Sequence, residues 1–98
     1  MNDQSPRQRP EIQNEELWVF PMDYPIKLIG ETCDELNNSV VEILVKHFPE
    51  FDETTLKFQP SRTGKYNSIT AQLRFEELEQ VHALYADLAA CPYIKTAL

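Results

Sequence analysis

The stretch QPSRTGKYNSITAQLRF, residues 59–75, decides the fold because a turn and a strong alternation meet in it. The segment around Gly64 is typical of a hairpin connection, since glycine adopts turn conformations that other residues avoid. From Tyr66 to Phe75, polar and apolar side chains alternate, as in a strand with one buried face. The sequence therefore predicts a hairpin in which a strand over residues 54–60 pairs with this one.

Two helical patterns flank the hairpin. Thr32 begins a capping-box pattern with Glu35, which predicts the N-terminus of a helix that Pro49 ends. From Glu76 to Pro92 the apolar residues recur every three to four positions, which predicts a second helix. Two further strands are predicted by short alternating runs, one over residues 26–29, beginning after Pro25, and one over residues 93–98.

The resulting order is β-α-β-β-α-β, and each predicted strand has one apolar face. Two helices on a single face of a four-stranded antiparallel sheet would bury those faces, which defines an α+β sandwich of the ferredoxin-like type. Right-handed crossovers then place the first and third strands in the centre. Residues 1–14 are polar and contain two prolines, so we predict a flexible tail followed by one domain over residues 15–98.

Composition narrows the class of protein. The formal net charge of −7 disfavours non-specific binding to nucleic acid or to an anionic membrane. No apolar run approaches the roughly 20 residues of a membrane-spanning helix, and no signal-like segment is present. We therefore predict a cytoplasmic protein without a membrane partner, in which Cys33 and Cys91 are reduced thiols.

The alternation also predicts which side chains lie on the face that the helices leave bare. Each strand contributes one cation to this open face: Lys27, Lys57, Arg74 and Lys95. Most acidic residues fall on the helices and connections, which predicts an acidic helical side and a weakly basic sheet side. Two interpretations stay open, a solvated polar surface or a surface that docks a partner, a second copy or an anionic ligand.

Patterns for catalysis and nucleic-acid recognition are weak. RNA-recognition domains share this topology and stack bases on aromatic residues of the central strands, where this chain has Ser68, Thr70 and Gln72. Nucleic-acid binding by the basic face is therefore only the alternative function. His47 and His82 lack the spacing of a metal-binding pair, and no catalytic set is indicated. The sequence predicts a protein that is not an enzyme and has no cofactor or metal.

Two runs, FPMDYPIKLIG at 20–30 and QPSRTGKYNSITAQLRF at 59–75, resemble the small bacterial YbeD-like proteins over roughly residues 14–98. The most specific match consists of Pro60, Ser61, Gly64, Tyr66 and Ser68. The resemblance implies an ACT-like fold and a non-catalytic regulatory module. It also implies a link to lipoate metabolism, because such proteins are often encoded near a lipoate-attachment enzyme.

The predicted function is that of a small regulatory or interaction module that binds a metabolite or a protein partner. The candidate contact residues form two segments, Gly30, Glu31 and Thr32 after the first strand, where ACT-type effector sites form, and Ser61, Arg62, Gly64, Lys65, Tyr66 and Ser68 around the hairpin. A homodimer is also expected, because so small a domain has a modest core and Val45 extends the first helix's apolar stripe.

Overall fold

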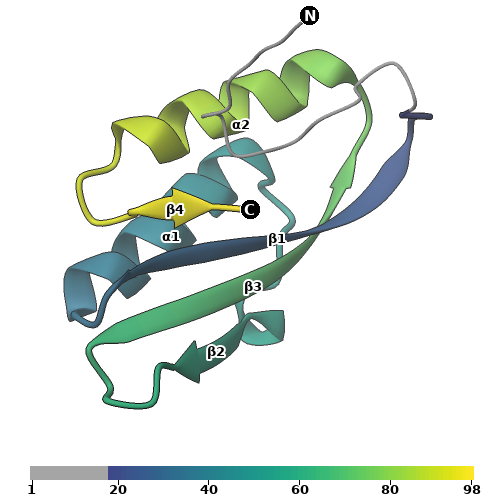
Figure 1. Ribbon diagram of the computed structural model, residues 1–98. Coiled ribbons are helices and arrows are strands. Elements are labelled where there is room, and N and C mark those ends of the chain that lie inside the picture. The colour runs from purple at the N-terminus through teal and green to yellow at the C-terminus, as the bar shows by residue number, and fades with distance from the viewer. Residues whose placement is uncertain (1–17) are drawn as a thin grey trace, which may run out of the picture.

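In the computed structural model of this protein, which describes residues 18–98, an antiparallel sheet carries two helices on one side (Figure 1). The elements are β1 (Met22–Glu31), α1 (Asp34–His47), the 3-10 turn η2 (Glu53–Thr55), β2 (Lys57–Pro60), β3 (Tyr66–Phe75), α2 (Leu78–Ala90) and β4 (Thr96–Ala97). The four strands have the order β2-β3-β1-β4, so the first and third are central. The predicted ferredoxin-like fold is confirmed.

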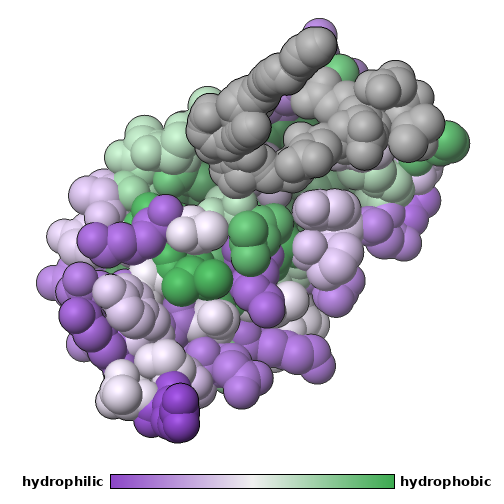
Figure 2. Space-filling view, in the orientation of Figure 1, coloured by the Kyte–Doolittle hydropathy of each residue, from purple (hydrophilic) through white to green (hydrophobic). Residues whose placement is uncertain are grey.

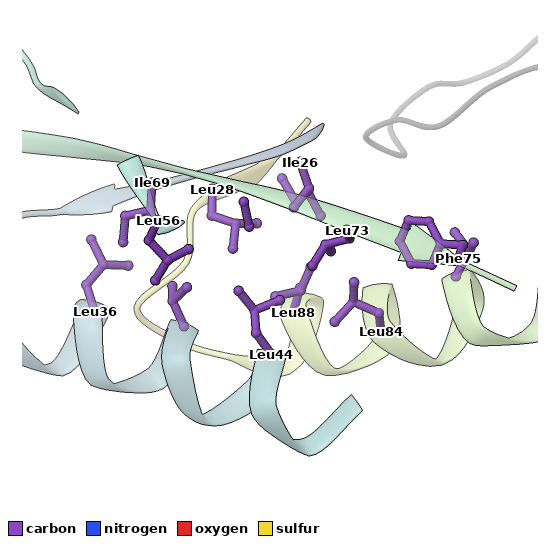
Figure 3. Packing of buried hydrophobic residues seen from close by; sticks show 14 residues of the cluster. Ile26, Leu28, Leu36, Leu44, Leu56, Ile69, Leu73, Phe75, Leu84 and Leu88 are labelled. Atoms are coloured by element: carbon purple, nitrogen blue, oxygen red, sulfur yellow. The ribbon is translucent and has the colours of Figure 1, made fainter. Parts of the chain in front are cut away.

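The core lies between the helices and one face of the sheet (Figure 3). Leu36 and Leu44 of α1 and Leu84 and Leu88 of α2 point toward the strands, in line with their helical spacing. The strands contribute the alternate residues of β1 and β3, which are fully or almost fully buried: Ile26, Leu28, Ile69, Ala71, Leu73 and Phe75. Each fully buried large apolar side chain stabilises the fold by roughly 1.5–3 kcal/mol.

β1 is longer than predicted, because it begins at Met22 and not after Pro25. It pairs with β3 from Met22 opposite Phe75 to Glu31 opposite Tyr66. On its other side, toward β4, β1 exchanges backbone hydrogen bonds between Lys27 and Leu98. Residues two apart face the same neighbour, so Pro25 also faces that side, where β4 does not extend. Its missing N–H therefore costs the ladder no hydrogen bond.

The start of α1 also differs from the prediction. The N-cap is Cys33, without a side-chain capping bond, and the helix begins at Asp34. The Thr32 hydroxyl, predicted to cap the helix, instead donates a hydrogen bond to the Gly64 carbonyl at 2.8 Å. Thr32 is therefore a link between the loop after β1 and the hairpin after β2.

The two outer strands are shorter than the alternation predicted. Asp52 accepts a hydrogen bond from the Thr54 N–H at 3.0 Å and stabilises η2, so β2 begins only at Lys57. Phe58 does face the helix side, opposite buried Ile69, but it is 49% exposed because β2 is an edge strand. Leu98 is three residues from Lys95, which was predicted on the open face, so the alternation predicts that Leu98 faces inward. It instead lies on the open face beside Lys27.

Two predictions concern the N-terminal part of the chain. The predicted flexible tail over residues 1–14 lies outside the described residues. The run NEELWVFP, residues 14–21, also predicts one helical turn that Pro21 ends, and residues 14–17 of that run lie outside the described residues as well. The end of that expected turn, Trp18 to Phe20, is not helical. Within residues 18–98, neither helix has the length and apolar character needed to cross a membrane.

Candidate functional site

The open face of the sheet, opposite the helices, presents every second residue of each strand. Cross-strand partners point to the same face, so the register defines its members. They are Asp23, Pro25, Lys27, Ile29 and Glu31 of β1, Lys57 and Gln59 of β2, Tyr66, Ser68, Thr70, Gln72 and Arg74 of β3, and Thr96 of β4. The predicted open-face residues of β1, β2 and β3 therefore do share one surface.

Lys27 and Lys57 form the basic part of this face. Both lie opposite Thr70, one on each side of β3. Strands are about 4.8 Å apart, so the two lysine backbones are separated by roughly 10 Å. Neither lysine makes an ion pair within residues 18–98. This pair of cations is therefore available to a negatively charged group.

The other two predicted cations are paired with acids. Arg74 Nη1 lies 3.3 Å from Asp23 Oδ1, and Arg74 Nε lies 3.7 Å from Glu76 Oε2. Lys95 Nζ lies 3.9 Å from Glu31 Oε2. Asp23 was missed because the strand was predicted to begin after Pro25. The expected separation of an acidic helical side from a basic sheet side is therefore only partly correct, because two acids stand on the sheet.

An apolar patch lies on the open face where β1 meets the edge strand β4, and apolar atoms gather on this face in Figure 2. Ile29 is half-buried opposite Thr96, and Leu98, which pairs with Lys27, is 49% exposed. The two side chains are diagonal neighbours across the strand pair, within reach of each other. The open face thus combines an apolar patch with polar and basic neighbours.

The two candidate segments from the sequence meet at the end of the sheet. The Thr32 N–H donates to the Lys65 carbonyl at 2.9 Å, and the Thr32 hydroxyl binds the Gly64 carbonyl. Within the hairpin, the Tyr66 N–H donates to the Ser61 hydroxyl at 3.1 Å. These bonds hold the hairpin against the loop after β1.

Several of these candidate residues have a structural task. The position of a Cβ on Gly30 would overlap the Tyr93 carbonyl oxygen and lie 2.9 Å from Leu36 Cδ1, so this glycine allows a close approach of the chain before β4. Gly64 has a φ of +80°, which favours glycine in the hairpin. In contrast, Arg62 and Lys65 are exposed, and the Lys65 ammonium stands 5.5 Å from the centre of the Tyr66 ring.

A polar cluster that the sequence analysis missed joins the helices. His47 Nε2 donates to Asp87 Oδ2 at 2.7 Å, and Lys46 Nζ donates to the same oxygen at 3.0 Å. The hydrogen bond from His47, followed by that from Lys46, lowers the pKa of Asp87. Forty residues separate His47 from Asp87, so no local spacing could indicate the pair. Its geometry fits a helix–helix contact, since His47 is only 14% exposed.

Cys33 and Cys91 are free thiols, and both are half-buried. Across residues 18–98, no group of three or more histidine, cysteine or acidic side chains is arranged to hold a metal ion. The geometry defines a small ferredoxin-like domain with an open sheet face as its candidate site.

Comparisons with known proteins place this domain in a family. A family model described as "Protein of unknown function (DUF493)" matches residues 15–98. The UPF0250 protein of Janthinobacterium sp. (strain Marseille) is 36% identical over 84 residues, which are 86% of this chain and 92% of the relative. The UPF0250 protein of Shewanella sediminis is 38% identical over 84 residues, which are 86% of this chain and 93% of the relative. The chain belongs to the DUF493 family, and the predicted resemblance to YbeD-like proteins is confirmed.

The solved structures agree on the fold. The solution structure of protein HP0495 from H. pylori matches with a TM-score of 0.65 and covers 95% of this chain and 98% of that one. The sequences are 16% identical, so this likeness shows the shared fold alone.

Proposed function

We propose that this protein is a non-catalytic interaction module that binds a protein partner with the open face of its sheet. The observation that carries the proposal is the apolar patch of Ile29 and Leu98 beside Lys27 and Lys57, which make no ion pair within residues 18–98. An apolar centre with a polar rim is the usual composition of a protein–protein contact. The partner surface is expected to combine apolar side chains with acidic ones.

The surroundings of the effector-site loop favour a protein partner over a metabolite. Gly30 is covered by Tyr93 and Leu36, and both the N–H and the hydroxyl of Thr32 are bonded to the hairpin. These groups hold the fold together and are not turned toward a ligand. The link to lipoate metabolism implied by the family resemblance names the first partners to test, the lipoate-attachment enzymes.

The composition of β3 argues against the alternative, nucleic-acid binding. Ser68, Thr70 and Gln72 stand on the open face of this central strand, where base stacking needs aromatic rings. Tyr66, at the end of β3, is the aromatic residue of this face within residues 18–98. A cytoplasmic location and a regulatory role remain predictions from the sequence.

The test is quantitative affinity capture from a lysate of the source organism. The bait carries Lys27→Glu and Lys57→Glu together, and the matched control carries Arg62→Glu and Lys65→Glu, the same change of charge on the hairpin. We expect the open-face variant to retain about tenfold less partner than the native protein, because acidic groups would then face acidic groups. The hairpin control should retain it.

Three results would count against the proposal. Equal capture by all three baits would show that the open face takes no part. Loss only in the hairpin control would move the contact to residues 61–66. Binding that is abolished by nuclease treatment of the lysate would favour the nucleic-acid alternative.

A further inference from the structure

A second surface, separate from the open face, lies at the outer edge of β2. β2 is the first strand in the order of the sheet, so within residues 18–98 no strand covers its outer side. All four of its residues are exposed. The Ser61 N–H donates to the Tyr66 carbonyl at 2.8 Å, which fixes the pattern of the ladder between β2 and β3.

That pattern determines which backbone groups point outward. Residues two apart in an antiparallel strand face the same neighbour, so Lys57 and Gln59 face β3, as Ser61 does. Phe58 and Pro60 therefore direct their backbone groups away from the sheet. Because proline has no N–H, Phe58 alone in β2 offers both a donor and an acceptor at this edge.

The side chain of Phe58 adds an apolar contact at the same place. It stands on the helix side of the sheet, opposite Ile69, and is 49% exposed. Lys46 and His47 both contact Asp87 of α2. Because a helix rotates by about 100° per residue, the residue before them, Val45, lies on the flank of α1 that faces away from α2. α1 is the helix nearer to β2 (Figure 1). Val45, 38% exposed, is a further exposed apolar side chain on that flank.

We propose that the occupant of this edge is a second copy of the chain, paired antiparallel through β2 with the two-fold axis at Phe58. Each Phe58 N–H then donates to the Phe58 carbonyl of the other copy. This register uses the one residue of β2 with both groups available, and it requires no N–H from Pro60. The two phenyl rings meet on the helix side of the extended sheet.

The charges at the two ends of β2 fit this arrangement. Acidic Asp52 and Glu53 precede the strand, and basic Arg62 and Lys65 follow it, all four exposed. An antiparallel partner brings the beginning of one β2 beside the end of the other, so the acids of each copy lie near the cations of its partner. In the same register, Lys57 lies opposite Gln59 of the second copy, so no two lysines face each other.

The surface chemistry therefore favours self-pairing over pairing with an unrelated strand. A heterologous peptide could use the Phe58 backbone, but it would need its own cations beside Asp52 and Glu53 and its own acids beside Arg62 and Lys65, which a second copy already has. In the self-pairing register, the acids before each β2 and the cations after it both lie near opposite charges of the other copy. It also leaves the open faces of the two copies side by side and accessible.

The experiment is sedimentation equilibrium of the full chain over a concentration series. We expect a reversible dimer, and we expect Phe58→Asp to raise its dissociation constant by at least about tenfold, because two carboxylates would meet at the axis. The matched control is Tyr93→Asp, which introduces the same charge at an aromatic residue that is 41% exposed next to β4. This control should dimerise as the native protein does.

A charge exchange tests the register itself. Arg62→Glu and Glu53→Arg should each weaken the homodimer, while an equimolar mixture of the two variants should recover association as a heterodimer. A native protein that is monomeric up to its solubility limit would overturn the proposal and leave the edge to another partner. A dimer indifferent to Phe58→Asp, or a mixture that shows no recovery, would overturn it as well.

Hydrogen exchange provides a readout that needs no substitution. The Phe58 amide has no strand partner within residues 18–98 and is hydrogen-bonded in the proposed dimer. Its protection should increase with protein concentration, while that of an amide on the open edge of β4, Ala97, should not. Protection of Phe58 that is independent of concentration would contradict self-pairing at this edge.

Discussion

Replacement of Gly30 by alanine should destabilise this protein through one steric conflict. The new methyl group would overlap the backbone oxygen of Tyr93 and stand 2.9 Å from Leu36 Cδ1. A leucine methyl can rotate away, but the carbonyl belongs to the chain segment before β4 and moves only if that segment moves. Overpacking of this kind costs about 1–3 kcal/mol, so we expect a loss of about 2 kcal/mol.

The assay is urea unfolding followed by the fluorescence of Trp18, supported by thermal unfolding. For a domain of this size, 1 kcal/mol corresponds to roughly 4–8 °C, so the melting temperature should fall by about 8–16 °C. Gly64→Ala is the matched comparison. Within residues 18–98, no atom beyond the adjoining residues lies within 4 Å of the Cβ position of Gly64, but the φ of this residue is +80°. The substitution should cost about 1–2 kcal/mol, and Gly64→Asn should recover part of that loss.

The two glycines separate steric from conformational causes. Gly30→Ala should leave the hairpin turn at Gly64 intact. Any residue larger than alanine at position 30 should destabilise the protein at least as much, because it meets the same carbonyl oxygen. A Gly30→Ala variant that unfolds within about 0.5 kcal/mol of the native protein would refute the close packing of β1 against the chain before β4.

Three further substitutions test the core, the hairpin link and the helix contact. Phe75→Ala should lower the free energy of unfolding by about 3–5 kcal/mol, because Phe75 is fully buried and the centre of its ring lies 5.6 Å from that of Phe48. A decrease below about 1 kcal/mol, measured by equilibrium unfolding, would be inconsistent with this core. Thr32→Val removes the hydrogen bond to the Gly64 carbonyl and should lower the free energy of unfolding by about 1 kcal/mol. Thr32→Ser keeps the hydroxyl and should not have this effect. Asp87 has a lowered pKa in the folded state, so its ionised form contributes stability above the ordinary value of 3.8, and this contribution is lost as the pH falls through the lowered pKa. Asp87→Asn should therefore be less stable than the native protein at neutral pH and equally stable well below pH 3.8; a difference that persists in acid would contradict the pairing with His47.

The fold could be predicted from the sequence because its signals are local and repeat. The alternation from Tyr66 to Phe75 and the helical spacing of Leu36, Val40 and Leu44 both correspond to buried faces in the structure. Each pattern is set by the geometry of one element, so it can be read without knowing the neighbours. The order of the elements then restricted the topology.

The candidate site was less predictable because it depends on register and on distant partners. Leu98 was expected to face inward, but its pairing with Lys27 turns it to the open face and creates the apolar patch. Asp23 was overlooked because Pro25 suggests a strand boundary, although its ring faces the side that β4 does not reach. Thr32 has the local pattern of a cap, yet its hydroxyl binds a carbonyl 32 residues away.

The central claim, that a protein partner binds the open face, can be tested directly by photocrosslinking in cells of the source organism. A photoreactive phenylalanine analogue is placed at Thr70, between Lys27 and Lys57, and in a parallel strain at Glu42, on the exposed side of α1. A discrete adduct with another protein should form from position 70 and not from position 42. An adduct that forms from position 42 alone, or none from position 70, would contradict the proposed binding face.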